Sequence, residues 1–222
     1  MADARPFDIS RFKDTVKASI LKHRISTQDD HSEDFFTMAL ALSAAVKKVL
    51  FEKSETKFSS EPVIEKKPIV QFMRRMRVDG MEKFQATAFF SFVHFYRNAA
   101  ALETEQPLGI LIVYIERTFV PEMLRLLKYP YIDYDDDAQV LDGMGAIANL
   151  IAGQFKRELA RLGYADLEMS HFQSHVNSVV NGVDYPHDQN EKYEISFEVD
   201  GKKRMAVEMV VDPLPKIMVE EL

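Results

Sequence analysis

The sequence predicts an α+β fold in which helices pack on one face of a mainly antiparallel sheet. Several segments carry apolar residues at intervals of three and four, which is the period of a helix with one buried face. Other segments alternate apolar and polar residues, and two Asp-Gly pairs stand between extended runs, which is typical of antiparallel hairpins. The order along the chain is helices, strands, helix, long helix and strands, which favours the α+β arrangement.

The composition excludes several kinds of chemistry. The 222 residues include no cysteine, so disulfides, thiolate zinc sites, iron–sulfur clusters and a cysteine nucleophile are excluded. The 28 Lys and Arg residues against 35 Asp and Glu give a formal net charge of -7, which argues against a general affinity for nucleic-acid phosphate. The chain has no run of about 18 consecutive apolar residues, so no membrane span is predicted. The first ten residues do not resemble a secretory signal. We therefore expect a cytoplasmic protein whose partner is neither nucleic acid nor a membrane.

Two amphipathic helices are expected near the start of the chain. Within residues 10–22, Phe12, Val16 and Ile20 recur at every fourth position. Residues 34–50 form a longer and more apolar helical pattern, with Ser32 and Asp34 as candidate caps. The narrow apolar faces and mixed charges of both segments indicate packing within the protein and not binding to a membrane surface.

The middle of the chain changes to extended segments. Residues 69–78 and 81–96 predict two strands joined at Asp79-Gly80, because Asp-Gly accepts the positive φ angles of a type I′ turn. Residues 109–115 are almost wholly apolar and predict a central strand. A short helix is expected over residues 118–128, and Pro130 should end it.

The remaining chain predicts one long helix followed by a hairpin. Residues 138–162 carry apolar residues at steps of three and four up to Gly163. The aspartates at 133–137 suit a helix N-terminus, where negative charge is favoured, and a metal site is the alternative interpretation of this acidic run. Residues 193–199 and 205–211 alternate apolar and polar residues on either side of Asp200-Gly201, which predicts the hairpin.

His94 and a group of basic residues have ordinary structural interpretations. His94 lies within an aromatic strand and is expected to be a hydrogen-bonded core residue. The densest basic group is interpreted as a solvated strand face, with an anionic partner as the alternative. This group comprises Arg74, Arg75, Arg77 and Lys83.

The long helix carries the clearest functional pattern. At about 100° per residue, Asp142, Asn149 and Gly153 fall within roughly 40° of one another, opposite the apolar stripe, so they should face outward. Gly145 and Ala146 lie between them, so this face should be nearly bare. An interior glycine costs roughly 0.5–1 kcal/mol relative to alanine, which some contact should offset. Either another segment of the chain or a partner protein packs closely on this face, and the amide of Asn149 favours the partner.

The segment from Asp142 to Gly153, Asp-Gly-Met-Gly-Ala-Ile-Ala-Asn-Leu-Ile-Ala-Gly, resembles the signature helix of the CheC/CheX family of chemotaxis phosphatases. That signature has Asp or Ser, three residues, Glu, two residues and Asn, with a Gly downstream. A weaker resemblance extends from about residue 32 to residue 212, which implies a CheX-like domain over residues 32–222 after an N-terminal helical extension over residues 1–31. The sequence departs from the family pattern at Ala146, in the place of the Glu, and at 171–173, where the family usually has a Pro.

The resemblance implies a function in two-component signalling. In the family this helix docks on a phosphorylated response regulator, and its Asn positions water for attack on the aspartyl phosphate. Asn149 would then be the catalytic, water-positioning amide, and Asp142 would be the flanking acid. The small residues Gly145, Ala146 and Gly153 would form the surface that contacts the partner. The regulator holds the magnesium ion in this chemistry, so no metal or cofactor is expected in this chain.

Three hypotheses about function follow. The first is a domain that binds a phosphorylated response regulator through helix 138–162, with phosphatase activity weak or lost because a partner-contacting charge is missing. The second is an active aspartyl-phosphate phosphatase that uses Asn149. The third is a non-catalytic structural or homo-oligomerisation domain. Because the family often pairs through sheet edges, the resemblance also implies a homodimer.

Overall fold

The computed structural model describes residues 31–54, 58–130 and 132–215, without the side chains of residues 51–54. The helix predicted within residues 10–22 lies outside this part of the chain. The described helices are α2 (Ser32–Ser54), α3 (Ala99–Glu103), the short 3-10 helix η1 (Arg117–Phe119), α4 (Val120–Leu126) and α5 (Asp137–Arg161). None of these helices is both long enough and apolar enough to cross a bilayer.

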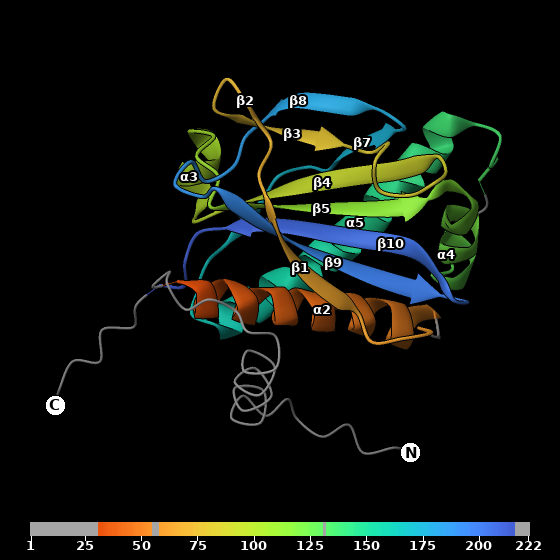
Figure 1. The fold of residues 1–222 in the computed structure, drawn as a ribbon, viewed down its shortest axis with the longest axis horizontal. Coiled ribbons are helices and arrows are strands. Elements are labelled where there is room, and N and C mark those ends of the chain that lie inside the picture. Colours follow the sequence, from red (N-terminus) through yellow and green to blue (C-terminus); the bar gives the residue numbers. More distant parts are fainter. Residues whose placement is uncertain (1–30, 55–57, 131, 216–222) are drawn as a thin grey trace, which may run out of the picture.

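The described strands form two sheets in which every pair is antiparallel (Figure 1). The main sheet has the order β1-β9-β10-β5-β4-β6, with β7 also paired to β4, and the small sheet has the order β2-β3-β8. The strands are β1 (Val63–Pro68), β2 (Gln71–Phe72), β3 (Arg75–Asp79), β4 (Ala88–Tyr96), β5 (Gly109–Glu116), β6 (Glu168–Met169), β7 (Gln173–Val176), β8 (Val179–Val183), β9 (Glu191–Val199) and β10 (Lys202–Val211).

The main sheet is covered on one face by helices and partly covered on the other by the small sheet. Along β4, Phe89, Val93 and Phe95 pack into the larger core with α2, α4 and α5. Phe90 and Phe92 point the opposite way, into a smaller core beneath β3 and β8. Figure 1 shows α5 crossing behind the strands and the small sheet above them. The predicted α+β class with helices on one face is therefore confirmed, and the small sheet is an addition that the sequence pattern did not predict.

The structure confirms several predicted elements. They could be predicted because the sequence signal of each lies within its own segment. β5 is buried from Gly109 to Ile115 and lies inside the main sheet, as expected for an almost wholly apolar strand. The hairpin of β9 and β10 turns at Asp200 and Gly201, whose φ angles are +52° and +71°. Both residues thus have the positive φ that a type I′ turn requires.

The predicted hairpin at Asp79-Gly80 is wrong. β3 pairs with β8 in the small sheet, and β4 begins only at Ala88 and pairs with β5, β6 and β7. Gly80 is needed for close packing, since a Cβ at this position would lie 2.6 Å from the ring of Phe90. The tight turn occurs earlier, between β2 and β3, at Met73 and Arg74, whose φ angles are +50° and +61°.

His94 has the core position that the sequence predicts. It is buried on β4, and its Nε2 donates to the backbone oxygen of Asp184 at 3.0 Å. Burial lowers the pKa of His94, although the hydrogen bond and the charge of Asp184 oppose this shift. The neutral ring thus ties β4 to the segment that follows β8.

Two buried glutamates organise the polar part of the outer face of the main sheet. Glu194 on β9 and Glu208 on β10 are almost completely buried. Lys83 donates to both carboxylates and lies 2.6 Å from Glu194 Oε2, while the hydroxyl of Tyr114 donates to Glu208 Oε2 at 2.8 Å. Three further lysines complete the network, namely Lys67 and Lys203 at Glu194 and Lys192 at Glu208. Lys83 therefore belongs to a buried ion-pair network, and its interpretation as part of a solvated strand face is wrong.

We expect Lys83→Met to destabilise the protein by roughly 2 kcal/mol. The change keeps the length of the side chain but removes the cation that bridges two buried carboxylates, and an uncompensated buried charge is costly. Lys48→Met, at an exposed position on α2, is the matched control and should change the free energy of unfolding by less than about 0.5 kcal/mol. Urea unfolding at neutral pH measures both, and equal effects would show that Lys83 does not contribute to stability through its ion pairs.

We also expect the stability to fall as the pH falls below about 4.5. Burial alone would raise the pKa of Glu194, but hydrogen bonds from Lys203 and Lys83 outweigh it and hold this pKa well below its ordinary 4.5. A carboxylate whose pKa is depressed by folding contributes stability above its unfolded pKa and loses it as the pH falls toward the folded pKa. Glu194→Gln should therefore be less stable at pH 7 and converge with the wild type at low pH. Glu122→Gln, at an exposed position on α4, should retain the wild-type dependence in urea unfolding across this range.

Candidate functional site

α5 carries the candidate site, and it begins and ends at the signals that the sequence contains. Asp136 caps its N-terminus by accepting a hydrogen bond from the backbone nitrogen of Ala138 at 2.9 Å, and Asp137 places a second carboxylate in the first turn. Leu162 is the C-terminal cap, and Gly163 follows it with a φ of +116°. The acidic run thus serves the helix N-terminus, as predicted.

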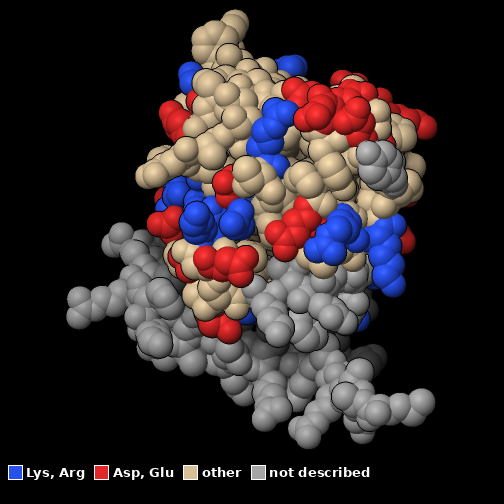
Figure 2. Space-filling view, turned by 90° about the vertical axis from the view of Figure 1, so that its right-hand side faces the viewer, with Lys and Arg blue, Asp and Glu red and all other residues tan. Residues whose placement is uncertain are grey.

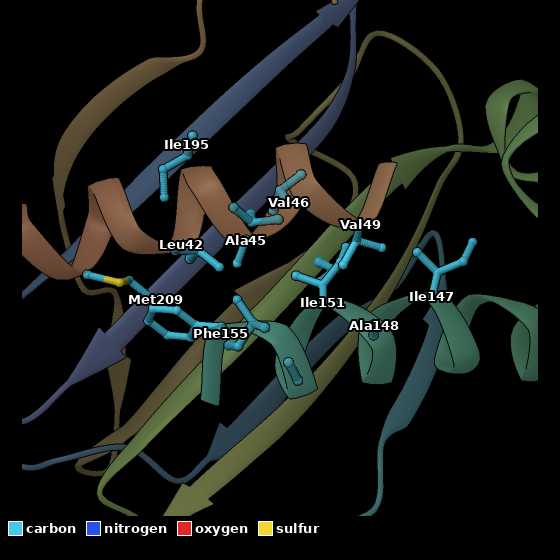
Figure 3. Close-up of a cluster of buried hydrophobic side chains, with 14 of the residues drawn as sticks. Leu42, Ala45, Val46, Val49, Ile147, Ala148, Ile151, Phe155, Ile195 and Met209 are labelled. Carbon is cyan, nitrogen blue, oxygen red and sulfur yellow. The ribbon is translucent and has the colours of Figure 1, made fainter. Parts of the chain in front are cut away.

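The inner side of α5 is held by α2 and by the main sheet. Ile147, Ile151 and Phe155 are fully buried, and Figure 3 shows them in one cluster with side chains of α2. The ring of Phe155 also meets Phe95 of β4 edge-on, with the ring centroids 5.8 Å apart. Burial of each such side chain contributes about 1.5–3 kcal/mol, so this packing sets how α5 is rotated about its axis.

The opposite side of α5 exposes the residues that the helical period places there. Asp142 and Asn149 are exposed, while Ala146 and Gly153 are half-buried. We call these four residues the outer stripe. The side chain of Asn149 makes no hydrogen bond with any other described residue. Its amide donor and acceptor are therefore available to water or to a partner.

Two glycines near this face are buried by other parts of the same chain. A Cβ on Gly143 would lie 2.7 Å from Leu124 of α4, and a Cβ on Gly145 would lie 2.0 Å from the ring of Phe172. Close packing of α4 and of the segment before β7 therefore explains both glycines. The expectation that Gly145 lies on the exposed face is wrong, because the ring of Phe172 covers it.

Gly153 differs from these two glycines. No heavy atom of the described chain lies within 4 Å of a Cβ built on it, apart from its own helix backbone and chain neighbours. Internal packing therefore does not offset its cost to the helix. Contact of Ala146 and Gly153 with a partner stays a prediction, and the surface at these residues is open enough for it.

Asp142 is held at the N-terminal end of the outer stripe by Tyr129. The hydroxyl of Tyr129 donates to Asp142 Oδ2 at 2.8 Å, and both residues line a shallow hollow of about 430 Å³. This hydrogen bond to the carboxylate raises the pKa of Tyr129, and burial adds to the shift. The sequence pattern did not reveal Tyr129, because it lies outside α5 and shares no periodicity with it.

The far end of the outer stripe is basic. Arg157 is exposed one helical turn beyond Gly153, and its Nε donates to Gln154 Oε1 at 3.1 Å. The exposed side of α5 thus has a carboxylate near one end and a guanidinium near the other. On the face drawn in Figure 2, acidic and basic side chains are interspersed, with one acidic group toward the upper right.

Comparison with known proteins identifies the fold. No protein-family model and no curated protein sequence matches the chain. The CheX chemotaxis protein from Desulfovibrio desulfuricans matches in structure with a TM-score of 0.51 and 15% sequence identity, over 79% of this chain and 99% of that chain. A chemotaxis protein from Desulfovibrio vulgaris Hildenborough matches with a TM-score of 0.50 and 17% identity, over 79% of this chain and 96% of that chain.

This chain has the fold of CheX-like chemotaxis proteins. The fold expected from the signature helix is therefore confirmed over most of the chain. The CheX-like fold supplies the long helix and the sheet that supports it. The roles of Asn149 and Asp142 stay predictions, as do the partner contacts of Ala146 and Gly153.

We expect the same substitution to have opposite effects at two glycines of α5. Gly145→Ala should destabilise the protein by about 1 kcal/mol, because forcing a methyl group against the ring of Phe172 outweighs the gain in helix propensity. Gly153→Ala should stabilise it by about 0.5–1 kcal/mol, because its Cβ meets open space. Thermal unfolding of both variants tests this, and an equal change in both would contradict the packing described at Gly145.

Proposed function

We propose that this CheX-like protein binds a phosphorylated response regulator through the outer stripe of α5, with weak or no phosphatase activity of its own. The observation that carries this proposal is the exposed amide of Asn149, to which no other described residue forms a hydrogen bond and which lies on a nearly bare helix face. Such an amide can hold a water molecule and a phosphoryl oxygen at the same time. The regulator would supply the phosphorylated aspartate and the magnesium ion, so this chain would need no metal of its own.

The dimensions and charges of the outer stripe support this proposal. Asp142 and Asn149 lie seven residues apart, which is about two turns or roughly 10 Å along the helix. The small residues Ala146 and Gly153 leave room for another protein to approach the helix. Tyr129 holds Asp142 in one position, so less side-chain entropy is lost on binding. Arg157 at the other end would pair with a carboxylate of the regulator.

Ala146 is the reason to expect weak hydrolysis. It stands where the CheC/CheX pattern has a Glu. The acidic residue of the outer stripe, Asp142, already accepts a hydrogen bond from Tyr129. Phosphoryl transfer depends mostly on positioning, so loss of one charged contact to the partner lowers the population of the productive complex. Binding with slow turnover therefore fits this surface better than efficient catalysis. This role would also place the protein in the cytoplasm, where response regulators act.

Purified receiver domains of response regulators from the same genome provide the test. We expect binding only to receivers carrying beryllofluoride and magnesium in place of the phosphoryl group, measured by fluorescence anisotropy. Asn149→Ala should weaken this binding and slow any residual loss of radiolabelled phosphate, without changing the melting temperature. Asn181→Ala, an exposed amide on β8, is the matched control and should change neither.

Ala146→Glu extends this test to catalysis. Restoring the carboxylate should accelerate loss of phosphate from the receiver at least about tenfold, which corresponds to roughly 1.4 kcal/mol of transition-state stabilisation. Fast, Asn149-dependent hydrolysis by the unmodified protein would instead favour an active phosphatase. Absence of binding to every receiver would contradict the proposal and favour a structural domain.

A further inference from the structure

A hollow of about 610 Å³ lies at the end of the main sheet where α2 begins and β10 ends, toward the left of Figure 1. This volume is within the range of small-molecule binding sites. The residues that line the hollow come from the start of α2, from β1 and β9, and from the segments that follow β4, α5, β8 and β10. Many separate parts of the chain thus meet around one cavity, away from the outer stripe of α5.

Three aromatic rings line this hollow. Phe35 belongs to α2, Tyr193 to β9 and Tyr164 to the segment that follows α5. Tyr164 and Tyr193 are buried and Phe35 is half-buried, so these rings are held by the fold. The faces of aromatic rings attract organic cations, and the attraction is stronger where water is excluded. The rings therefore favour a cationic ligand that also has an apolar surface.

The charged side chains of the hollow leave one carboxylate unmatched. Glu191 forms an ion pair with Lys66, and Asp212 lies 3.5 Å from Arg97. Asp188 also lines the hollow, and it forms no hydrogen bond or ion pair with another described residue. These three carboxylates and two cations leave one negative charge without a partner, which is the charge that a single ammonium group would neutralise.

Asp188 and Asp212 influence each other across this hollow. Burial raises the pKa of the Asp212 carboxyl, and the negative charge of Asp188 adds to this rise, although Arg97 opposes it. Arg97 therefore does not fully compensate the two carboxylates. A cation bound near both of them would reduce their repulsion.

Backbone hydrogen bonds hold the carboxylate-bearing segments in place. The hydroxyl of Tyr164 donates to the backbone oxygen of Asp212 at 2.8 Å. The backbone nitrogen of Ile69 donates to the backbone oxygen of Asn190 at 2.9 Å, which fixes the segment just after Asp188. A ligand would therefore meet a largely preformed site, and less conformational entropy would be lost on binding.

We propose that this hollow binds a small, freely diffusing organic ammonium compound. Its alkyl groups would contact the rings of Phe35, Tyr164 and Tyr193, and its charge would lie nearest Asp188 and Asp212. A metal ion fits less well, because the described residues include no group of three His, Asp or Glu side chains that could hold one. An anion would meet the unmatched carboxylate of Asp188.

This proposal does not rest on the function proposed for α5. None of the residues that line the hollow lies within α5. Asn149→Ala, which should weaken binding of a receiver, should therefore leave binding of an ammonium compound unchanged. The two proposals can thus fail separately.

Isothermal titration calorimetry of the full chain with choline chloride tests the proposal. We expect saturable binding of choline, and binding at least about tenfold weaker for 3,3-dimethylbutan-1-ol, which has the same shape without the charge. Sodium chloride at the same ionic strength should not compete with choline, because a sodium ion offers no apolar surface to the rings.

Two variants separate the contributions of charge and of aromatic rings. Asp188→Asn should raise the dissociation constant of choline at least about fivefold, because it removes the unmatched negative charge. Phe35→Leu keeps an apolar side chain but removes a ring, and it should raise this constant at least about twofold. Asp200→Asn, at an exposed position at the other end of β9, is the matched control and should change nothing. Circular dichroism establishes that each variant is folded.

Three results would overturn the proposal. They are the absence of choline binding at millimolar concentrations, equal affinity for the uncharged isostere, and binding that neither Asp188→Asn nor Phe35→Leu weakens. Vesicles of phosphatidylcholine carry the same ammonium group on a lipid, next to a phosphate that Asp188 and Asp212 would repel. We therefore expect the protein to stay in the supernatant when these vesicles are sedimented. Co-sedimentation that Asp188→Asn abolishes would overturn the assignment to a freely diffusing ligand.

Discussion

Burial of one side of α5 against α2 and the main sheet is the contact on which the candidate site depends. Ile147, Ile151 and Phe155 are fully buried there, in one cluster with side chains of α2 (Figure 3). Because successive residues are about 100° apart, the buried side also determines the exposed side. The exposure of Asp142 and Asn149 is therefore a consequence of core packing. The same core packing that stabilises the fold also positions the surface proposed for binding.

The glycines of α5 differ in whether another segment of the chain packs against them. Gly143 and Gly145 let Leu124 and Phe172 close on the flanks of the helix, so those flanks belong to the fold. Gly153 meets no other segment within residues 31–54, 58–130 and 132–215, so in the described part of the chain it belongs to the open surface. One residue type thus has two roles within three turns. What distinguishes the roles is the presence or absence of a neighbouring segment.

The main sheet separates two surfaces of different character. Its helical face supports α5 and the outer stripe, while its other face carries the ion-pair network of Glu194 and Glu208 and lies beneath the small sheet. The small sheet in turn carries the tight turn at Met73 and Arg74. The two surfaces therefore lie on opposite sides of the main sheet.

The elements whose signals lie within one segment could be predicted from the residues of that segment alone. The period of residues 138–162 predicted which side of α5 is buried, and Asp200-Gly201 predicted the last hairpin, because both depend on neighbouring residues. The folded structure was needed to show what covers Gly145, which carboxylates hold Lys83, that Tyr129 holds Asp142, and that Asp79-Gly80 makes no hairpin. In each case the deciding residue is brought close by the folding of the chain. The spacing of residues along one segment does not predict such contacts between distant segments. It does predict helices and strands, because their periods depend only on neighbouring residues.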